Sequence, residues 1–168
     1  MKPTLQHRNS IKSTSPLPSK RVVFPYGWQE ALLSWDAQPR IRLLLADDHF
    51  ILRQALTVAL SEEADLQIIG QANHGREAIE LANYLQPDVI LMDIQMPICN
   101  GVAATRTIHQ HYPWIKILVL SGCDEEKYIS QALQAGALNY FLKSRLSYQE
   151  IVAAVRAAYR SCYVPRAR

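Results

Sequence analysis

The sequence of 168 residues has few cysteines and no long apolar run, so it lacks the disulfide pattern of small cross-linked proteins and the apolar segment of a membrane span. Its three cysteines, Cys99, Cys123 and Cys162, are an odd number with no Cys-x-x-Cys spacing. This argues against a disulfide framework, and a chain of this length buries enough surface to fold without disulfides or a structural metal. No apolar stretch approaches the ~18 residues that a membrane span requires. We therefore predict a globular domain in the reducing cytoplasm, with no membrane association.

Positive charge is also scarce outside the first 40 residues. That segment holds six lysines or arginines against two acids, a net charge of +4, whereas the rest of the chain has twelve against thirteen, a net charge of −1. A DNA-binding domain is expected to carry a basic face on its folded part. The charge distribution therefore predicts no direct DNA binding by this chain.

Residues 1–40 differ from the rest of the chain in amino-acid composition and in the pattern of apolar residues. Polar, proline and basic residues up to about residue 22 predict disorder, and Trp28, Ala31, Leu32 and Trp35 then form one stripe of a short amphipathic helix over about 28–36. Because so short a helix is not stable alone in water, we expect it to dock either on its own domain or on a partner. An organellar transit peptide, or a start assigned too far upstream, would also explain this basic leader.

From residue 41 to about 161, short apolar runs alternate five times with helical stripes, a pattern typical of an α/β domain. A tail of residues 162–168 follows. The helices expected over about 102–111 and 125–135 have narrower stripes of apolar residues than the other expected helices. Because the apolar runs are nearly continuous, we expect strands that are covered on both faces. The expected strands are residues 41–46, 66–71, 89–92, 115–120 and 140–142.

Polar side chains follow four of these strands at the point where each strand ends. Asp47 and Asp48 follow the first strand, Asp93 the third, Ser121 the fourth and Lys143 the fifth. A doubly wound sheet of right-handed βα units binds its ligand at the carboxyl ends of its strands. Each of these residues alone would be an ordinary cap, loop or surface residue. Their shared place at one edge of the sheet predicts a common site.

Three carboxylates at one site repel one another unless a cation or raised pKa values relieve them. Mg²⁺ suits such a site because it takes oxygen ligands and leaves positions open for phosphate oxygens. Lys143 would add a positive charge and Ser121 a hydroxyl donor opposite a phosphoryl group. The site therefore predicts phosphoryl transfer, in which an aspartate beside the metal can be the nucleophile.

Four segments together resemble the receiver domain of two-component response regulators. They are LLLADDHFILRQAL at 43–56, VILMDIQMPICNG at 89–101, ILVLSG at 117–122 and ALNYFLK at 137–143. The Asp-Asp-His-x-x-x-Arg start, and Lys143-Ser144 in place of Lys-Pro, look most like the NarL/FixJ subfamily. The resemblance implies a flavodoxin-like parallel sheet of strand order 2-1-3-4-5 with five helices.

The same resemblance assigns roles at the predicted site. Asp93 would be the phospho-acceptor for the phosphohistidine of a sensor kinase, for a phosphotransfer protein or for a small phosphodonor. Asp48 would bind Mg²⁺ directly, Asp47 mostly through water, and Gln95 through its main-chain carbonyl. Lys143 would be the ion-pair partner of the phosphoryl group.

Ser121 and Tyr140 would be the two switch side chains. A phosphoryl group adds roughly −1.5 to −2 charges and three acceptor oxygens, so the Ser121 hydroxyl can move in to donate to it. Tyr140 would then turn inward, although a half-buried aromatic ring with no switching is the alternative. Gln95 and Cys123, each two residues beyond a site residue, should border the phosphoryl group and tune its lifetime.

We expect a signalling switch that catalyses only its own phosphorylation and dephosphorylation. It would act through a partner or a homodimer formed by the fourth helix, the fifth strand and the fifth helix. One alternative is the receiver part of a shortened DNA-binding transcription regulator, since the last helix ends near Arg160 and leaves no room for a DNA-binding domain. A scaffold that needs no phosphorylation is another. An aspartyl-phosphate hydrolase is disfavoured because Gln95 stands where such enzymes need an acid.

Overall fold

The computed structural model describes residues 40–161, which form five strands and five helices. The predicted helix at 28–36, the rest of the basic segment up to residue 39, and the tail at 162–168 lie outside the described residues. The strands are β1 Ile41–Ala46, β2 Leu66–Ala72, β3 Val89–Met92, β4 Lys116–Ser121 and β5 Asn139–Leu142. The helices are α2 Phe50–Ser61, α3 Gly75–Leu85, α4 Gly101–His111, α5 Glu126–Gln134 and α6 Tyr148–Arg160.

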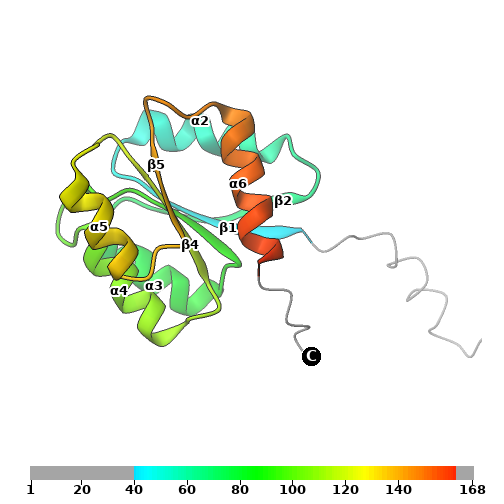
Figure 1. Ribbon diagram of the computed structural model, residues 1–168. Helices are drawn as coiled ribbons and strands as arrows, with labels where there is room; N and C mark the ends of the chain where they lie inside the picture. The colour runs from blue at the N-terminus through cyan, green and yellow to red at the C-terminus, as the bar shows by residue number, and fades with distance from the viewer. Residues whose placement is uncertain (1–39, 162–168) are drawn as a thin grey trace, which may run out of the picture. The chain divides into compact units, whose positions relative to one another are not determined.

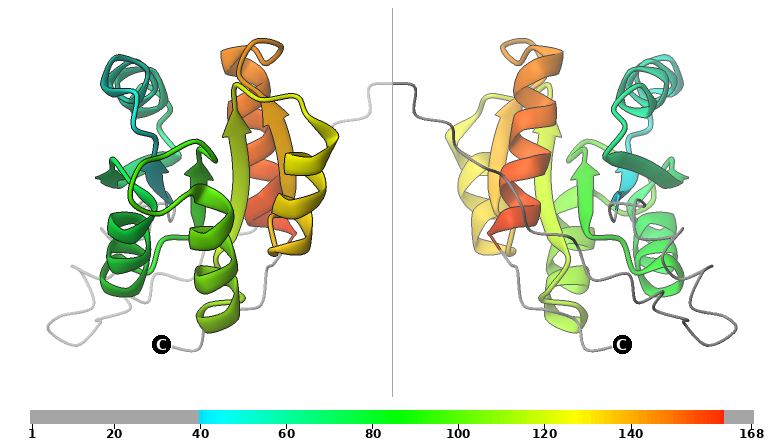
Figure 2. Two further views of the ribbon diagram at one scale, coloured as in Figure 1. Left: turned by 90° about the vertical axis from the view of Figure 1, so that its left-hand side faces the viewer. Right: turned by 90° about the vertical axis from the view of Figure 1, so that its right-hand side faces the viewer.

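All strands pair in parallel in the order β2-β1-β3-β4-β5, which confirms the predicted flavodoxin-like topology (Figure 1). The arrowheads of β3, β4 and β5 point in the same direction (Figure 2). The winding reverses at β1, which has β2 on one side and β3 on the other. In this register Ala46 pairs with Met92, so the next residue of each strand, Asp47 and Asp93, emerges at the same level.

The helices form a layer on each face of the sheet (Figure 1). Because successive side chains of a strand point to opposite faces, Leu43 and Leu45 of β1 pack with residues of α2 and α6. Leu44 and Ala46 pack with residues of α3 and α4 on the other face. Both layers leave the carboxyl edge of the sheet free for polar side chains.

Coverage differs between the central and the edge strands. All residues of β3 are buried, as are nearly all residues of β1 and β4. The edge strands β2 and β5 are only partly buried. Helices pack on both faces of the edge strands, as expected, but each edge strand has a neighbouring strand on one side only, so it is less completely buried than the central strands. Across residues 40–161, the structure contains no helix with the length and apolar character of a membrane span.

Candidate functional site

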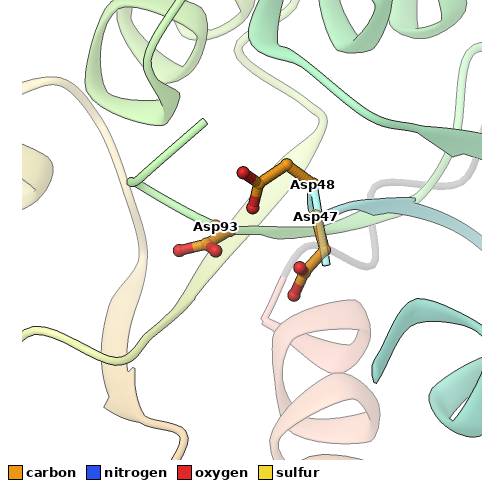
Figure 3. A group of neighbouring side chains, drawn as sticks. All are labelled: Asp47, Asp48 and Asp93. Carbon is orange, nitrogen blue, oxygen red and sulfur yellow. The ribbon is translucent and has the colours of Figure 1, made fainter. Parts of the chain in front are cut away.

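Asp47, Asp48 and Asp93 come together at the carboxyl edge, as the sequence predicts (Figure 3). A carboxylate oxygen from each lies within 4.8 Å of those from the other two. The backbone sets this arrangement, because the Asp93 N–H donates to the Ala46 carbonyl at 2.7 Å across the β1–β3 pair. Asp47 and Asp93 are buried, whereas Asp48 is exposed.

Lys143 reaches the same cluster from β5. Its ammonium nitrogen lies 2.7 Å from Asp47 Oδ2 and 2.7 Å from Asp93 Oδ2. The register of the sheet places it there, because Ser121 of β4 pairs with Leu142 and the Lys143 N–H donates to the Ser121 carbonyl at 2.8 Å. Residues from β1, β3 and β5 thus meet at one site, although 96 positions separate Asp47 from Lys143.

The site holds more negative than positive charge in a poorly solvated place. Burial raises the pKa of the Asp93 carboxyl, and this effect outweighs the stabilising bond from Lys143. Burial alone would lower the pKa of Lys143, but its bonds to Asp47 and Asp93 raise it overall, so the ammonium stays protonated. One lysine therefore does not neutralise the three carboxylates, and the cluster favours a further cation.

The donor set fits Mg²⁺ in its chemistry. Carboxylate oxygens are the ligands that this hard cation prefers, and it is usually bound by one or two carboxylates with waters and phosphate oxygens filling the rest. Asp48 is the most accessible of the three acids. The Asp93 carboxylate accepts a hydrogen bond from the Gln95 N–H at 3.2 Å, and Gln95 is exposed.

Ser121, Cys123 and Tyr140 form a second group beside the acids. Ser121 is fully buried, and its hydroxyl oxygen accepts a hydrogen bond from the Cys123 N–H at 3.3 Å. The Tyr140 hydroxyl donates to the Cys123 carbonyl at 2.6 Å. The backbone of Cys123 thus links the two predicted switch side chains, while the thiol lies 3.8 Å from a carboxylate oxygen of Glu125.

The sequence identifies Gly101 only as the boundary of a helix, but the structure gives it a part in the site. A Cβ atom at this position would lie 1.8 Å from the carbonyl oxygen of Asp93. The Gly101 N–H also donates to the Ile94 carbonyl at 2.9 Å. The start of α4 can pack this closely behind Asp93 only because residue 101 has no side chain.

The loop between β3 and α4 contains a second feature that the sequence does not reveal. Ile98 has a φ of +66°, in the left-handed region that a β-branched residue rarely adopts. Its side chain is 75% exposed, so packing of that side chain does not explain the conformation. The loop instead closes on neighbouring backbone, where the Cys99 carbonyl accepts a hydrogen bond from the Gly75 N–H at 2.9 Å.

A flavodoxin-like sheet with an acidic cluster and a lysine at its carboxyl edge defines a receiver-type signalling domain. Comparison with known proteins agrees, because the sequence profile of the response regulator receiver domain matches residues 43–156. The chain belongs to this family, which consists of signal transducers of two-component systems. Receiver domains bind Mg²⁺ in an acidic pocket, and Asp47, Asp48 and Asp93 form an acidic group of this kind.

Individual relatives point to the NarL-like branch that the sequence motifs indicate. The transcriptional regulatory protein YxjL of Bacillus subtilis is 40% identical over 121 residues, 72% of this chain and 55% of that protein. The response regulator GacA of Pseudomonas aeruginosa is 38% identical over 119 residues, 71% of this chain and 55% of that protein. This chain therefore spans about half the length of these relatives.

Solved structures include similar domains. The signal receiver domain of the NarL regulator from Mycobacterium tuberculosis superposes with a TM-score of 0.71 at 31% identity. The match covers 74% of this chain and 100% of that domain. The sequence resemblance to a receiver domain, and the fold that it implied, are thereby confirmed.

Proposed function

We propose that this chain is a receiver that is switched by Mg²⁺-dependent phosphorylation of Asp93. The phosphoryl group would come from the phosphohistidine of a sensor kinase, from a phosphotransfer protein or from a small phosphodonor, in the cytoplasm. One observation carries the proposal: the Lys143 ammonium lies 2.7 Å from the Asp93 carboxylate within a cluster of three acids. This is a nucleophile beside a fixed positive charge, at a site that favours a metal cation.

In the proposed reaction, a carboxylate oxygen of Asp93 attacks the phosphorus atom. The new O–P bond forms as the P–N bond to the donor imidazole breaks, and the imidazole leaves with the bonding electron pair and takes up a proton. Lys143 stabilises the negative charge on the phosphoryl oxygens as an ion-pair partner. Because this chemistry ends on the protein's own side chain, the domain is not an enzyme for external substrates.

Mg²⁺ would be held by the carboxylates of Asp48 and Asp93, by Asp47 mostly through water, and by the main-chain carbonyl of Gln95. When bound, it would reduce the repulsion between the Asp93 nucleophile and the incoming phosphoryl group. Asp48 is suited to direct ligation because its carboxylate is exposed at the site.

The conformational switch would run from Ser121 to Tyr140. Movement of the Ser121 hydroxyl toward the phosphoryl group would break its bond with the Cys123 N–H and release space behind β4. Tyr140 would give up its bond to the Cys123 carbonyl and turn inward. This would alter the face of α5, β5 and α6, which we propose as the surface for a partner or for a homodimer.

Two side chains would set the lifetime of the phosphorylated state. Gln95 and Cys123 lie two positions beyond Asp93 and Ser121 in the sequence, so we expect both to border the phosphoryl group and to influence attack by water. We expect Gln95→Asn and Cys123→Glu to change the rate of autodephosphorylation. An unchanged rate in both variants would remove this part of the proposal.

A second candidate function concerns the output. The relatives YxjL and GacA are regulators of which this chain matches about half. We therefore propose, as the second candidate, that this receiver is the receiver part of a transcription regulator. In either case, the described domain itself would contact protein rather than DNA.

Phosphorylation by acetyl phosphate tests the proposed function. The wild type should gain the mass of one phosphoryl group in the presence of Mg²⁺, should gain none with a chelator, and should then elute earlier in size-exclusion chromatography if it dimerises. Asp93→Asn is the matched control and should remain unmodified. Failure of the wild type to become phosphorylated would favour a scaffold that needs no phosphorylation.

A further inference from the structure

Four atoms of Asp47 take part in hydrogen bonds or an ion pair, and in this Asp47 differs from the adjacent Asp48. Its N–H donates to the Ala72 carbonyl at 3.0 Å, and its carboxylate accepts from the His49 N–H at 2.8 Å and from Lys143 at 2.7 Å. Its main-chain carbonyl accepts a hydrogen bond from the Arg53 guanidinium. Asp48 makes none of these bonds, so its position follows from the way in which Asp47 is held.

Arg53 lies in the first turn of α2, and its planar guanidinium spans two segments. Nη1 donates to the Asp47 carbonyl, and Nε donates to the side-chain oxygen of Gln71 on β2 at 3.2 Å. The guanidinium also lies 5.7 Å from the centre of the Phe50 ring. Arg53 therefore connects the β1–α2 loop to the edge strand.

Both acceptors of Arg53 are neutral, although acids are close by. The ion pairs found within residues 40–161 involve Lys143 and Arg156, and Arg53 forms none of them. Arg53 nevertheless lines the same small void as Asp47 and Asp93. The Arg53 guanidinium therefore donates to neutral acceptors although carboxylates are close by. This indicates that the directions of its hydrogen bonds, and not ion pairing, determine where the guanidinium lies.

We propose that Arg53 is a positioning residue for the metal site. By fixing the Asp47 carbonyl to β2 through Gln71, it holds the loop in the conformation that directs the Asp48 carboxylate toward Asp93. This inference rests on the proposed function, in which Asp48 and Asp93 bind Mg²⁺. Groups that orient metal ligands without touching the metal typically contribute a factor of about 10 to 100 in affinity.

A purely electrostatic role predicts the opposite sign. A guanidinium beside the acids repels Mg²⁺, so removing its charge would tighten metal binding. Removing a positioning residue would weaken metal binding, because Asp48 would lose its fixed place. The sign of the change in affinity therefore separates the two roles.

Titration calorimetry with MgCl₂ on the whole chain tests the proposal. We expect Arg53→Gln to weaken Mg²⁺ binding about 10-fold. Arg53→Lys should be weakened to a similar degree, because an ammonium keeps the charge but lacks the planar fork that reaches both acceptors. Gln54→Met is the matched control: Gln54 donates to the same Gln71 oxygen at 3.0 Å but does not reach Asp47. It should bind Mg²⁺ as the wild type does.

A second variant protects the test against loss of the fold. Gln71→Met removes only the outer acceptor and leaves Arg53 in place, so its affinity should fall between those of the wild type and Arg53→Gln. Thermal unfolding in a chelator should show all variants folded. The amide resonance of Asp48 should shift in the Arg53 and Gln71 variants, and should remain in place in the Gln54 control.

Two sets of results would overturn the positioning role. Arg53→Gln binding Mg²⁺ as tightly as the wild type or more tightly would do so, as would full affinity in Arg53→Lys. If Arg53→Gln does not fold, wild-type affinity in Gln71→Met would decide against it. Wild-type protein that binds no Mg²⁺ would instead overturn the proposed function together with this inference.

Discussion

Two clusters of mixed charge join distant parts of this domain, and they differ in composition and burial. At the carboxyl edge of the sheet, Lys143 pairs with the buried Asp47 and Asp93, and the exposed Asp48 completes a cluster of three carboxylates. On α6, the Arg156 guanidinium serves Glu63 and Asp65 in the α2–β2 connection. These three side chains are between 29% and 42% exposed, so water shares in their solvation.

The carboxyl pKa values move in opposite directions in the two clusters. Hydrogen bonding to Arg156 lowers the pKa of Asp65, because burial there is slight. Burial raises the pKa of Asp93, because one shared lysine does not compensate for the loss of water. Similar residue types thus give a charge-balanced contact in one place and, in the other, an acidic cluster with excess negative charge that favours binding of a cation. Burial and the ratio of acids to bases decide between them.

The largest effect should come from removing the lysine of the buried cluster. Lys143→Met deletes the positive charge that would stabilise the phosphoryl oxygens in the transition state, so phosphorylation of Asp93 by acetyl phosphate should slow about 100-fold. The initial rate of phosphorylation, followed by intact mass, measures this. Arg156→Met is the control and should keep the wild-type rate. Equal slowing of both variants would mean that the two clusters do not differ in function.

Removing the arginine should instead affect stability. Arg156→Met breaks hydrogen bonds to Asp65 at 2.6 and 2.8 Å and to Glu63 at 2.7 Å. We expect a loss of about 1 kcal/mol in the free energy of unfolding, less than three buried charged bonds would give, because solvent screens this pair. Urea denaturation measures the loss. Lys127→Met, at an exposed position on α5, should leave stability unchanged, and a similar loss there would show that the effect is not specific.

Neutralising the phospho-acceptor should stabilise the domain. Burial disfavours the charged form of the Asp93 carboxyl and raises its pKa, so Asp93→Asn should raise the free energy of unfolding by about 1 kcal/mol in metal-free buffer. Lys143 keeps Asp47 as a partner in this variant. Urea denaturation in a chelator checks the sign. A less stable Asp93→Asn would mean that the Lys143 ion pair outweighs burial.

The meeting of acids and lysine at the carboxyl edge can be predicted from the sequence, because the end of a strand is a local feature. The apolar runs place Asp47, Asp93 and Lys143 directly after strands, and a parallel sheet must bring those ends to one edge. The structure confirms that they meet. The uneven coverage of the edge strands is not visible in the same way, since an apolar run does not reveal which strands lie at the edge.

Contacts that depend on the packed backbone cannot be predicted in this manner. Asp47 and Asp48 are adjacent and chemically identical, so the sequence pattern does not reveal that only Asp47 is held on several sides. Arg53 is part of the sequence motif, but the motif does not predict its role. Its two hydrogen-bond acceptors, on Asp47 and Gln71, lie six residues before it and eighteen residues after it. The left-handed conformation of Ile98 runs against the preference of its own residue type.

The smallest effect concerns how the cluster of Arg156, Glu63 and Asp65 makes stability depend on pH. The pKa of Asp65 is lowered from 3.8 in the folded state, so its contribution to stability is fully present above pH 3.8 and is lost as the pH falls through the lower folded value. Asp65→Asn should therefore be less stable than the wild type near neutral pH, by about 0.5 kcal/mol at this exposure. The difference should close in acid. Urea denaturation of both proteins over a pH series measures it, and a gap that stays constant into acid would show that the Arg156 contact does not act through the charge of Asp65.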